Sequence, residues 1–420
     1  MKKLKKLLCC IVAALSCVTF SACDLGGMMD DIGFPSDGIF GDGGDTDSGD
    51  GSSDSGSDSS GDTGGSDETS SDDTASGSGD PSDGSSSGEE PSDSGDEPDT
   101  PVDIVTHELS IHFPFLGNVT SGDCALIKVG DTEVLIDAGS TTGSPATTVP
   151  YIRQYCTDGI LEYVIATHGD SDHISGFVGG SAAGIFASFE CGTIIDFPQT
   201  TKTKTSENTQ VYNNYVALRD AEVEAGAVHY TALECWNNAN GAKRSYELGE
   251  DITLNILYQK YYETSSSIEN NYSVCLMITQ GENNYLFTGD LEESGEESLV
   301  KSNDLPKCTL YKAGHHGSNT ASSKTLIDVI QPEIVVACCC CGDKYDFPHQ
   351  EFIDNIAPYT DKLYIPSMKK ADKTSALLNG NIVVWSDGKE VTVNCSNNNT
   401  LFKDTEWFKE NRQTPEKWLN

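Results

Sequence analysis

Four side chains that can bind a metal ion lie within six consecutive residues near the middle of the chain. They are His168, Asp170, Asp172 and His173, and they directly follow the apolar run 163–166. Imidazole nitrogens and carboxylate oxygens together bind divalent cations such as Zn, Mn or Fe. This cluster therefore predicts a metal site in a loop at the end of a buried strand.

Two further polar segments follow apolar runs later in the chain. Asp290 ends the segment 285–290, and the pair His315 and His316 follows the segment 310–314. One carboxylate has two oxygens, so Asp290 could bridge two cations, as two-metal hydrolysis requires. Taken alone, Gly-Asp after a strand is usually a turn, and a His-His pair is usually a surface pair. The three segments in this order are a more specific signal.

Alternating and apolar segments predict the strands and helices that carry these residues. One group of strands is expected at 108–113, 125–129, 133–137, 163–167 and 193–196. A second group is expected at 252–258, 274–279, 285–288, 309–311, 334–340, 362–365, 381–385 and 391–394. Helical patterns lie at 147–157, 207–226, 292–303, 320–330 and 349–357. Two runs of strands, each interleaved with helices, predict an α/β protein built as an αββα sandwich, with hairpin turns at 130–131 and 386–388.

The N-terminal quarter has the composition of an export signal followed by a tether. Residues 1–23 join a lysine-rich start to a short apolar run, which ends in a sequence that resembles a bacterial lipobox with Cys23 as the lipidated residue. Residues 24–105 hold 24 Asp or Glu and no Lys or Arg, which predicts an extended, disordered acidic tether. An acidic Ca²⁺ site is the minor alternative for the tether. We therefore expect a lipoprotein anchored on the extracellular face of a bacterial membrane.

One large globular domain is expected at 106–395, followed by a C-terminal tail at 396–420. After the N-terminal region, eleven of the 15 cysteines remain, an odd number for an exported protein. The four cysteines at 338–341 follow an apolar segment. A buried strand is expected there rather than a metal cluster, because neighbouring residues of a strand point to opposite faces. The tail could pack on the domain or bind a partner.

Together these motifs resemble the metallo-β-lactamase fold superfamily, and more closely the ComEC-like hydrolase domains of competence proteins. The resemblance rests on residues 122–127 with 135–139, and on 168–176, 287–290 and 315–318. It implies two divalent metal ions, Zn or Mn, as cofactors. The implied ligands are His168 and Asp170 for the first metal, Asp172, His173 and His315 for the second, and Asp290 as the bridge.

The resemblance also implies residues around the metals. Asp137 would orient a ligand histidine, and His316 with Ser318 would lie at the mouth, beside the anionic group of the substrate. The superfamily has a histidine on a middle strand where this chain has Asn271 and its neighbours, so the first metal would have fewer ligands. Late in the domain the chain reads Tyr-Asp-Phe-Pro instead of Tyr-Gly-His-Pro. The next residue, His349, either replaces that histidine as a proton donor or phosphate contact, or is an ordinary surface residue.

The implied activity is hydrolysis of a phosphodiester by a metal-activated water, with Asp172 or Asp290 as general base and His316 stabilising charge. ComEC-like domains imply a nucleic-acid substrate. The net charge of −40 and the lack of a basic, aromatic-rich stretch disfavour a polyanion. A cell-envelope phosphodiester, as for phosphorylcholine esterases of the same fold, is one alternative, and a catalytically inert surface-binding module is another. No protein partner is evident from the sequence.

Overall fold

The structure is a computed structural model that describes residues 109–202 and 209–419. The predicted signal peptide, the lipidation site Cys23 and the acidic tether lie outside the described residues. Within the described ranges, no helix combines the length and apolar character that crossing a membrane requires.

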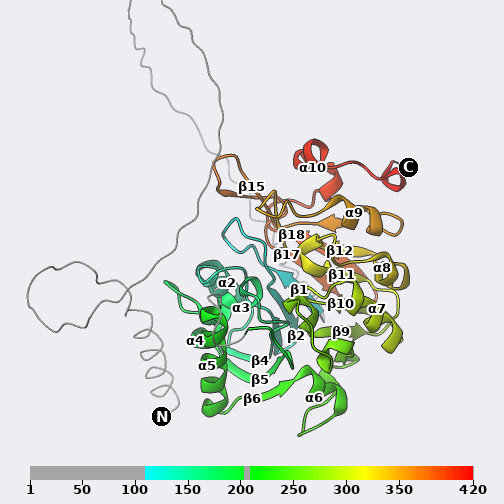
Figure 1. The fold of residues 1–420 in the computed structure, drawn as a ribbon. Coiled ribbons are helices and arrows are strands. Elements are labelled where there is room, and N and C mark those ends of the chain that lie inside the picture. Colours follow the sequence, from blue (N-terminus) through cyan, green and yellow to red (C-terminus); the bar gives the residue numbers. More distant parts are fainter. Residues whose placement is uncertain (1–108, 203–208, 420) are drawn as a thin grey trace, which may run out of the picture. The chain divides into compact units, whose positions relative to one another are not determined.

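Two large sheets form the centre of the molecule (Figure 1). The first has the order β18-β17-β1-β2-β3-β4-β5-β6. Its strands are β1 Leu109–Phe113, β2 Ala125–Val129, β3 Thr132–Ile136, β4 Ile160–Ile165, β5 Glu190–Asp196, β6 Val228–Thr231, β17 Ile382–Ser386 and β18 Val391–Cys395. β2 pairs with β3, and β17 with β18, in antiparallel register across the two predicted turns.

The second sheet has the order β14-β12-β11-β10-β9-β8-β7. Its strands are β7 Ser245–Gly249, β8 Ile252–Leu257, β9 Cys275–Gln280, β10 Asn283–Phe287, β11 Leu310–Lys312, β12 Ile334–Val336 and β14 Leu363–Tyr364. A small third sheet joins β13 Cys340–Cys341, β15 Ser367–Lys369 and β16 Ser375–Leu377. The two large sheets face each other across an apolar core, in which the rings of Phe113 and Phe287 stack with centroids 6.3 Å apart.

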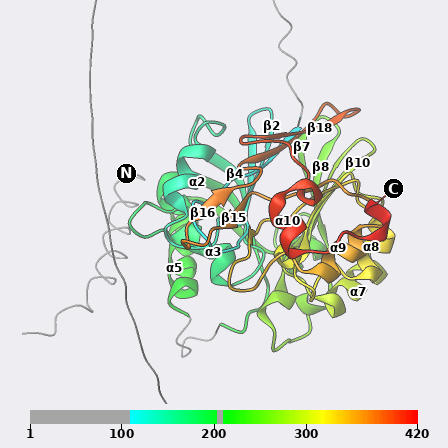
Figure 2. The same ribbon diagram turned by 90° about the horizontal axis from the view of Figure 1, so that it is seen from above.

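Helices cover the outer faces of both sheets (Figures 1 and 2). Beside the first sheet lie α2 Pro145–Ile152, α3 Ser171–Val178, α4 Ile185–Ser188 and α5 Gln210–Ala225. Beside the second lie α7 Glu293–Ser302, α8 Lys324–Ile330 and α9 Gln350–Ile356, while α6 Ala232–Asn237 contacts β6 and β8. The predicted αββα sandwich is therefore confirmed.

Two features of the fold differ from the sequence expectation, and a third decides how the C-terminal tail packs. The last two predicted strands, β17 and β18, join the first sheet beside β1 rather than the second, because β1 offers them a free antiparallel edge. The predicted strand 334–340 is divided into β12 and β13, which belong to different sheets. The tail forms α10 Glu406–Asn411, and its buried Phe402, Phe408 and Trp418 are part of the core beneath the second sheet.

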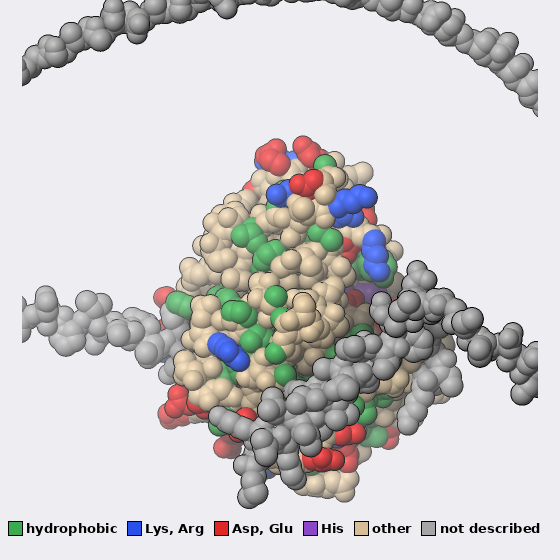
Figure 3. Space-filling model, turned by 90° about the vertical axis from the view of Figure 1, so that its left-hand side faces the viewer, with side chains coloured by type: hydrophobic (Ala, Val, Ile, Leu, Met, Phe, Trp, Pro, Cys, Tyr) green, Lys and Arg blue, Asp and Glu red, His purple; other side chains and the backbone are tan. Residues whose placement is uncertain are grey.

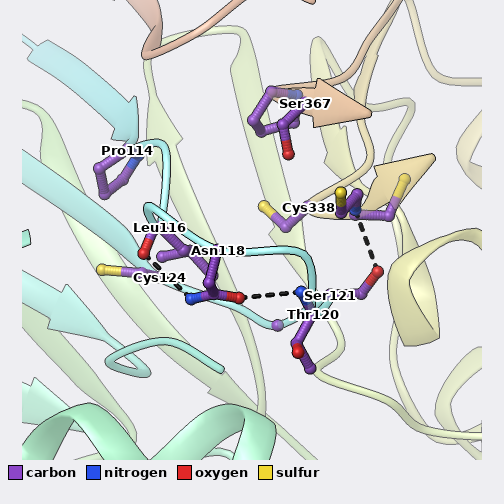
Figure 4. Close-up of a pocket in the computed structure, with 12 residues that line it drawn as sticks. Pro114, Leu116, Asn118, Thr120, Ser121, Cys124, Cys338 and Ser367 are labelled. Atoms are coloured by element: carbon purple, nitrogen blue, oxygen red, sulfur yellow. Dashed lines mark hydrogen bonds between the residues drawn. The ribbon is translucent and has the colours of Figure 1, made fainter. Parts of the chain in front are cut away.

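The four cysteines at 338–341 are buried, and their thiols are free. Cys338 packs into the core between the sheets, whereas Cys339 and Cys341 pack into the core beneath the second sheet. Figure 4 shows Cys338 and Cys124 beside a small pocket, which the loop that carries Ser121 also lines. The Ser121 hydroxyl accepts a hydrogen bond from the Cys340 amide. The alternation of faces agrees with the expectation that these cysteines act as buried apolar side chains.

Glu296 on α7 is a fully buried carboxyl that should make stability depend on pH. Burial raises its pKa to about 7, although the amides of Ser322 and Ser323 donate to it. The folded pKa exceeds the unfolded value of 4.5, so folded protein binds this proton more tightly. Stability should then fall by about 3 kcal/mol as pH rises from roughly 4.5 through 7.

Urea unfolding at pH 5 and pH 8 checks this expectation. Glu296→Gln should flatten the fall in the free energy of unfolding over that interval, while Glu297→Gln, at an exposed neighbour on the same helix, should leave it unchanged. If the free energy of unfolding of Glu296→Gln fell with pH as steeply as that of the wild type, the proton that stabilises the folded protein would not be on Glu296.

Candidate metal centre

The three predicted motifs meet at one edge of the two sheets. β3, β4 and β5 run parallel, as do β10, β11 and β12, so the carboxyl ends of each set lie at a common edge, where ligands of α/β proteins bind. His168 follows β4, Asp172 and His173 lie in the first turn of α3, and Asp290 follows β10. Gly176 lets α3 approach the first sheet closely, since a Cβ there would lie 1.7 Å from the carbonyl oxygen of Ala138.

A buried group of two imidazoles and two carboxylates, from His173, His316, Asp123 and Asp290, forms the centre of the site, and the half-buried Asp172 lies beside it. Nε2 of His173 lies 3.1 Å from Oδ2 of Asp290, and Nε2 of His316 lies 3.2 Å from the same oxygen. Oδ2 of Asp172 lies 3.4 Å from Nε2 of His316. Ligands about 2.0–2.1 Å from a tetrahedral ion are separated by roughly 3.4 Å, so these atoms have the spacing of a single metal site.

Several polar atoms of this group and of the neighbouring His168 are buried without a hydrogen-bond partner among the described residues. They are Nε2 of His168, His173 and His316, Nδ1 of His316, and Oδ1 of Asp123 and Asp290. Buried polar atoms are nearly always paired, and unpaired ones indicate that an ion or a water binds there. The donor set and its unpaired nitrogens therefore fit divalent cations.

Carboxylates lie behind both buried imidazoles. Nδ1 of His173 lies 2.7 Å from Oδ2 of Asp137; this oxygen also accepts a bond from the Thr167 hydroxyl, and Oδ1 accepts one from the Thr167 amide. Nδ1 of His316 lies 3.0 Å from Oδ1 of Asp123, within ion-pair distance but without hydrogen-bond geometry. The Asp137–His173 pair is a carboxylate–histidine arrangement that leaves Nε2 free to bind a metal. Asp137 thus lies where the resemblance placed it.

The carboxylates also determine how the histidines titrate. Burial alone would lower the pKa of His173, but Asp290 and Asp137 outweigh it and raise that pKa well above its usual value. His316 behaves in the same way, through Asp290 and Asp123. Although burial opposes ionisation of Asp290, the neighbouring imidazoles hold its pKa well below the usual range. A cation arriving at the site must therefore displace protons.

The expected positions of the two adjacent histidines are exchanged in the structure. His316, expected at the mouth, is buried among the metal-binding atoms. His315, expected to bind the second metal with Asp172 and His173, lies at the cavity wall with Nε2 3.8 Å from Asp290. Both residues adopt left-handed backbone angles in the 3₁₀ turn Gly314–Gly317, with φ of 45° and 57°. This turn decides which imidazole points inward, and spacing along the chain does not reveal it.

The first metal position is more open than the second. Nε2 of His168 lies 3.6 Å from Oδ2 of Asp170, whose side chain is 29 % exposed. Lys202 forms an ion pair with Asp170, so a cationic side chain already neutralises this carboxylate. Beside this position, Nε2 of His315 lies 3.8 Å from Oδ2 of Asp290, and its Nδ1 lies 2.8 Å from the hydroxyl of Thr320.

The remaining predicted residues lie at different distances from the centre. Asn271 is buried, but its amide bonds to Ser266 outside the site, and it is Asn270 that lines the cavity; the expectation for Asn271 is therefore wrong. Ser318 lines the cavity as expected. His349 also lines it, while Nδ1 accepts from the Asn319 amide and Nε2 lies 2.9 Å from the Tyr345 carbonyl oxygen. The His349 ring thus connects Asn319 and Tyr345 at the rim of the cavity.

Two residues at the centre were not predicted as site residues. Lys312, the last residue of β11, is buried and forms an ion pair with Asp123, and its Nζ lies 3.7 Å from Oδ1 of Asp290. The signal that could have revealed it is a lysine ending an otherwise apolar strand, three residues before the histidine pair. Asp123 was noted only as part of the family resemblance.

The site opens into a cavity of about 460 Å³. Metal-binding carboxylates form its floor, and polar and aromatic side chains form its walls. The lining residues are Thr120, Ser140, Asp170, Ser171, Asp172, Asn270, Asp290, His315, Ser318, Lys344, Tyr345, Phe347 and His349. Both metal positions are therefore open to the cavity from one side.

The exchange of the two histidines can be tested by removing each in turn. His316→Ala should abolish tight metal binding, because it removes a buried imidazole whose Nε2 lies 3.2 Å from Oδ2 of Asp290. His315→Ala should retain one tightly bound metal ion and lose mainly the weaker one. Metal content after dialysis, measured by elemental analysis, separates the two outcomes. Retention of the tight ion in His316→Ala, with its loss in His315→Ala, would reverse our assignment.

Comparison with known proteins agrees with this geometry. A family model described as the metallo-beta-lactamase superfamily matches residues 117–228 and 267–341. Those segments contain the metal-binding residues, and the sheets have the layered order of that fold. The chain is therefore a metallo-β-lactamase fold protein, and members of this superfamily are typically metal-dependent hydrolases that bind divalent metals.

Within that superfamily the chain is ComEC-like. It is 24 % identical over 247 residues to "Recombination protein 2" of Haemophilus influenzae, covering 58 % of this chain and 26 % of that protein. It is 24 % identical over 245 residues to "Competence protein ComA" of Neisseria gonorrhoeae, covering 58 % and 29 %. "ComE operon protein 3" of Bacillus subtilis is 28 % identical over 104 residues, covering 25 % and 13 %. The chain thus spans well under a third of the length of these relatives.

Solved structures to which the chain is similar are more distant in sequence. The metallo-beta-lactamase fold protein YhfI from Bacillus subtilis is 11 % identical, with a TM-score of 0.36, and covers 63 % of this chain and 97 % of its own. Igni18, a metallo hydrolase from Ignicoccus hospitalis, is also 11 % identical, with a TM-score of 0.36, and covers 64 % and 98 %.

Proposed function

We propose that this domain is a metal-dependent phosphodiesterase, with nucleic acid as its first candidate substrate. The observation that carries the proposal is the convergence of unpaired imidazole nitrogens of His173 and His316 on Oδ2 of Asp290, at the floor of an open cavity. The similarity to competence and recombination proteins supports nucleic acid as the substrate. Zn or Mn is the proposed metal, because the set combines imidazole with several carboxylates.

Different residues of the site would have different roles in such a reaction. Cations held by these ligands would lower the pKa of a bound water and stabilise charge on the phosphate. The Asp172 side chain is 28 % exposed and that of Asp290 only 2 %, so Asp172 is the better placed to take a proton from the cavity. His315 and Ser318 line the cavity and can contact the phosphate oxygens. His316 points at the metal-binding atoms, so its proposed role is that of a ligand.

Metal analysis combined with a generic substrate tests the proposal. The full chain should bind about two divalent ions, hydrolyse bis(p-nitrophenyl) phosphate with Mn²⁺ or Zn²⁺, and lose this activity in EDTA. Asp172→Ala should abolish turnover and keep the native circular dichroism spectrum, whereas Asp220→Ala, at an exposed site on α5, should be fully active. A metal-free, inactive wild-type protein would favour the inert surface-binding module instead.

A cell-envelope phosphodiester is the second candidate substrate. The net charge of −40 repels polyanions and favours this alternative. Parallel assays with plasmid DNA, single-stranded DNA and a glycerol phosphate polymer distinguish the two. Cleavage of the polymer alone would select the envelope substrate.

We also propose that the protein acts outside the cell, held to the membrane by a lipid on Cys23. The lysine-rich start, the short apolar run and the lipobox-like sequence support this location. In a bacterial expression host, labelled palmitate should enter the wild-type protein, and Cys23→Ser should prevent its incorporation.

A further inference from the structure

The cavity wall carries an aromatic ring that faces solvent. Tyr345 is 52 % exposed, an unusual state for a large ring, and it lines the same cavity as Asp172 and Asp290. Neither the metal centre nor the core uses this ring. It lies in the segment 342–349, between β13 and α9, where the chain departs from the Tyr-Gly-His-Pro pattern.

Tyr345 is the outermost member of a ladder of rings that starts at the metal centre. The ring of His316 lies 5.8 Å from that of Phe347, measured between centroids, and Phe347 lies 5.4 Å from Tyr345. Phe347 is buried and supports the inner side of Tyr345. A flat group stacked on Tyr345 would therefore be separated from His316, at the metal centre, by the rings of Tyr345 and Phe347.

The segment that carries Tyr345 is held in place by several bonds. The Tyr345 amide donates to Oδ1 of Asp343, at 2.8 Å, and Oδ2 of Asp343 accepts from the Ser121 hydroxyl. Arg412, from the C-terminal tail, donates to the carbonyl oxygen of Pro348. An exposed ring on a braced segment is already oriented for binding, which reduces the entropy lost when a ligand orders it.

A single cationic side chain accompanies this ring. Nζ of Lys344 lies 4.4 Å from the centroid of Tyr345, and Lys344 is the only Lys or Arg among the residues that line the cavity. Its side chain bonds to Tyr345, and Asp172 and Asp343 interact with it electrostatically. In a cavity whose floor is acidic, this lysine at the rim provides a contact for a phosphate.

We propose that Tyr345 and Lys344 form a nucleotide subsite, in which an unpaired base stacks on Tyr345 while Lys344 binds the phosphate next to the one being cleaved. This subsite rests on the proposed phosphodiesterase function and names its substrate class as single-stranded nucleic acid. Aromatic rings bind bases without sequence preference, because every base has a π face.

The same features disfavour the other substrates. On the described part of the surface in Figure 3, Lys and Arg form small separate groups rather than a continuous stripe along which a long duplex could lie. A cavity of about 460 Å³ suits one or two nucleotides. A choline head group would meet the positive charge of Lys344 at the ring that should bind it.

Equilibrium binding to two matched oligonucleotides tests the subsite. The probes are a fluorescein-labelled single-stranded DNA and the same backbone with abasic residues, measured by anisotropy against the full chain in EDTA, where no turnover occurs. Wild-type protein should bind the base-bearing strand roughly ten-fold more tightly, as expected for one stacked base. Tyr345→Ala should remove this preference, and Tyr345→Trp should keep it.

The controls separate stacking from charge and from folding. Lys344→Ala should weaken both strands equally and reduce the dependence of log Kd on log salt by about one, while Lys324→Ala, at an exposed lysine on α8, should change neither. Tyr359→Ala should leave the base preference intact. Equal affinity of wild-type protein for both strands would overturn the proposal. So would an equal loss for both strands in Tyr345→Ala, since the ring would then contact the sugar-phosphate backbone, as it would in an envelope polymer.

Cleavage assays with Mn²⁺ keep failure of the subsite distinct from failure of the proposed function. Hydrolysis of bis(p-nitrophenyl) phosphate without any base preference in binding would leave the phosphodiesterase standing and refute the subsite. A base preference that depends on Tyr345, without hydrolysis of any phosphodiester, would retain the subsite as a binding site and refute the enzyme.

Discussion

Asp290→Asn should abolish tight metal binding and lower turnover by roughly 10³-fold or more. Oδ2 of Asp290 is shared by His173, His316 and His315, so this one oxygen belongs to the surroundings of both metal positions. Losing about 4 kcal/mol of transition-state stabilisation corresponds to that factor. The amide keeps the shape of the side chain and removes its charge, which separates metal binding from packing.

Metal content and steady-state kinetics check this expectation together. Asp220→Asn, at an exposed carboxylate on α5, should retain both metals and wild-type turnover. The thermal midpoint in EDTA indicates whether Asp290→Asn is folded. A folded variant with unchanged metal content would contradict the place of Asp290 at the centre of the site.

Lys312→Met should lower the free energy of unfolding by about 3–5 kcal/mol in metal-free protein. Lys312 is buried between Asp123 and Asp290, and these two carboxylates raise its pKa although burial opposes the charge. Removing one partner of a buried ion pair leaves an uncompensated charge in the interior, which is costly. Asp123 would then keep only the imidazoles of His316 and His173 as compensating partners among the described residues.

Urea unfolding in EDTA measures the effect, with Lys324→Met at an exposed lysine as the matched control. The double variant Lys312→Met with Asp123→Asn should recover part of the loss, because the two residues are coupled. A change below about 1 kcal/mol in Lys312→Met would show that water or rearrangement compensates Asp123. Such a result would weaken the view that this lysine holds the site together.

The sequence predicted the layers of this protein because its strands are short, apolar and bounded by clear turn signals. The hairpins at 130–131 and 386–388 pair as expected, and the strands before His168, Asp290 and His315 end at the predicted edge. The sheet that accepts β17 and β18 was not predictable in this way. The alternating pattern of β17 and β18 suits an edge of either sheet. Only the free edge of β1 decides that they join the first sheet.

The metal-binding residues also divide into those that the local sequence predicts and those that only the packing of the sheets brings together. His168, Asp170, Asp172 and His173 were identifiable because local geometry determines them: a strand end followed by the first turn of a helix brings neighbours in sequence together in space. Asp123 reaches His316 across almost two hundred residues, and Lys312 reaches both Asp123 and Asp290. Such contacts depend on how the two sheets pack, which no spacing along one segment records.

By itself, then, the sequence determined the chemistry available to this protein, namely imidazoles and carboxylates that follow apolar strands. Only the tertiary structure decided which of them converge. The left-handed turn at Gly314–Gly317 sends His316 inward and His315 to the cavity wall, and the braced rim leaves Tyr345 facing solvent. The physical reason is that residue types and local periodicity follow from sequence, whereas the direction of a side chain in a turn depends on contacts from distant strands.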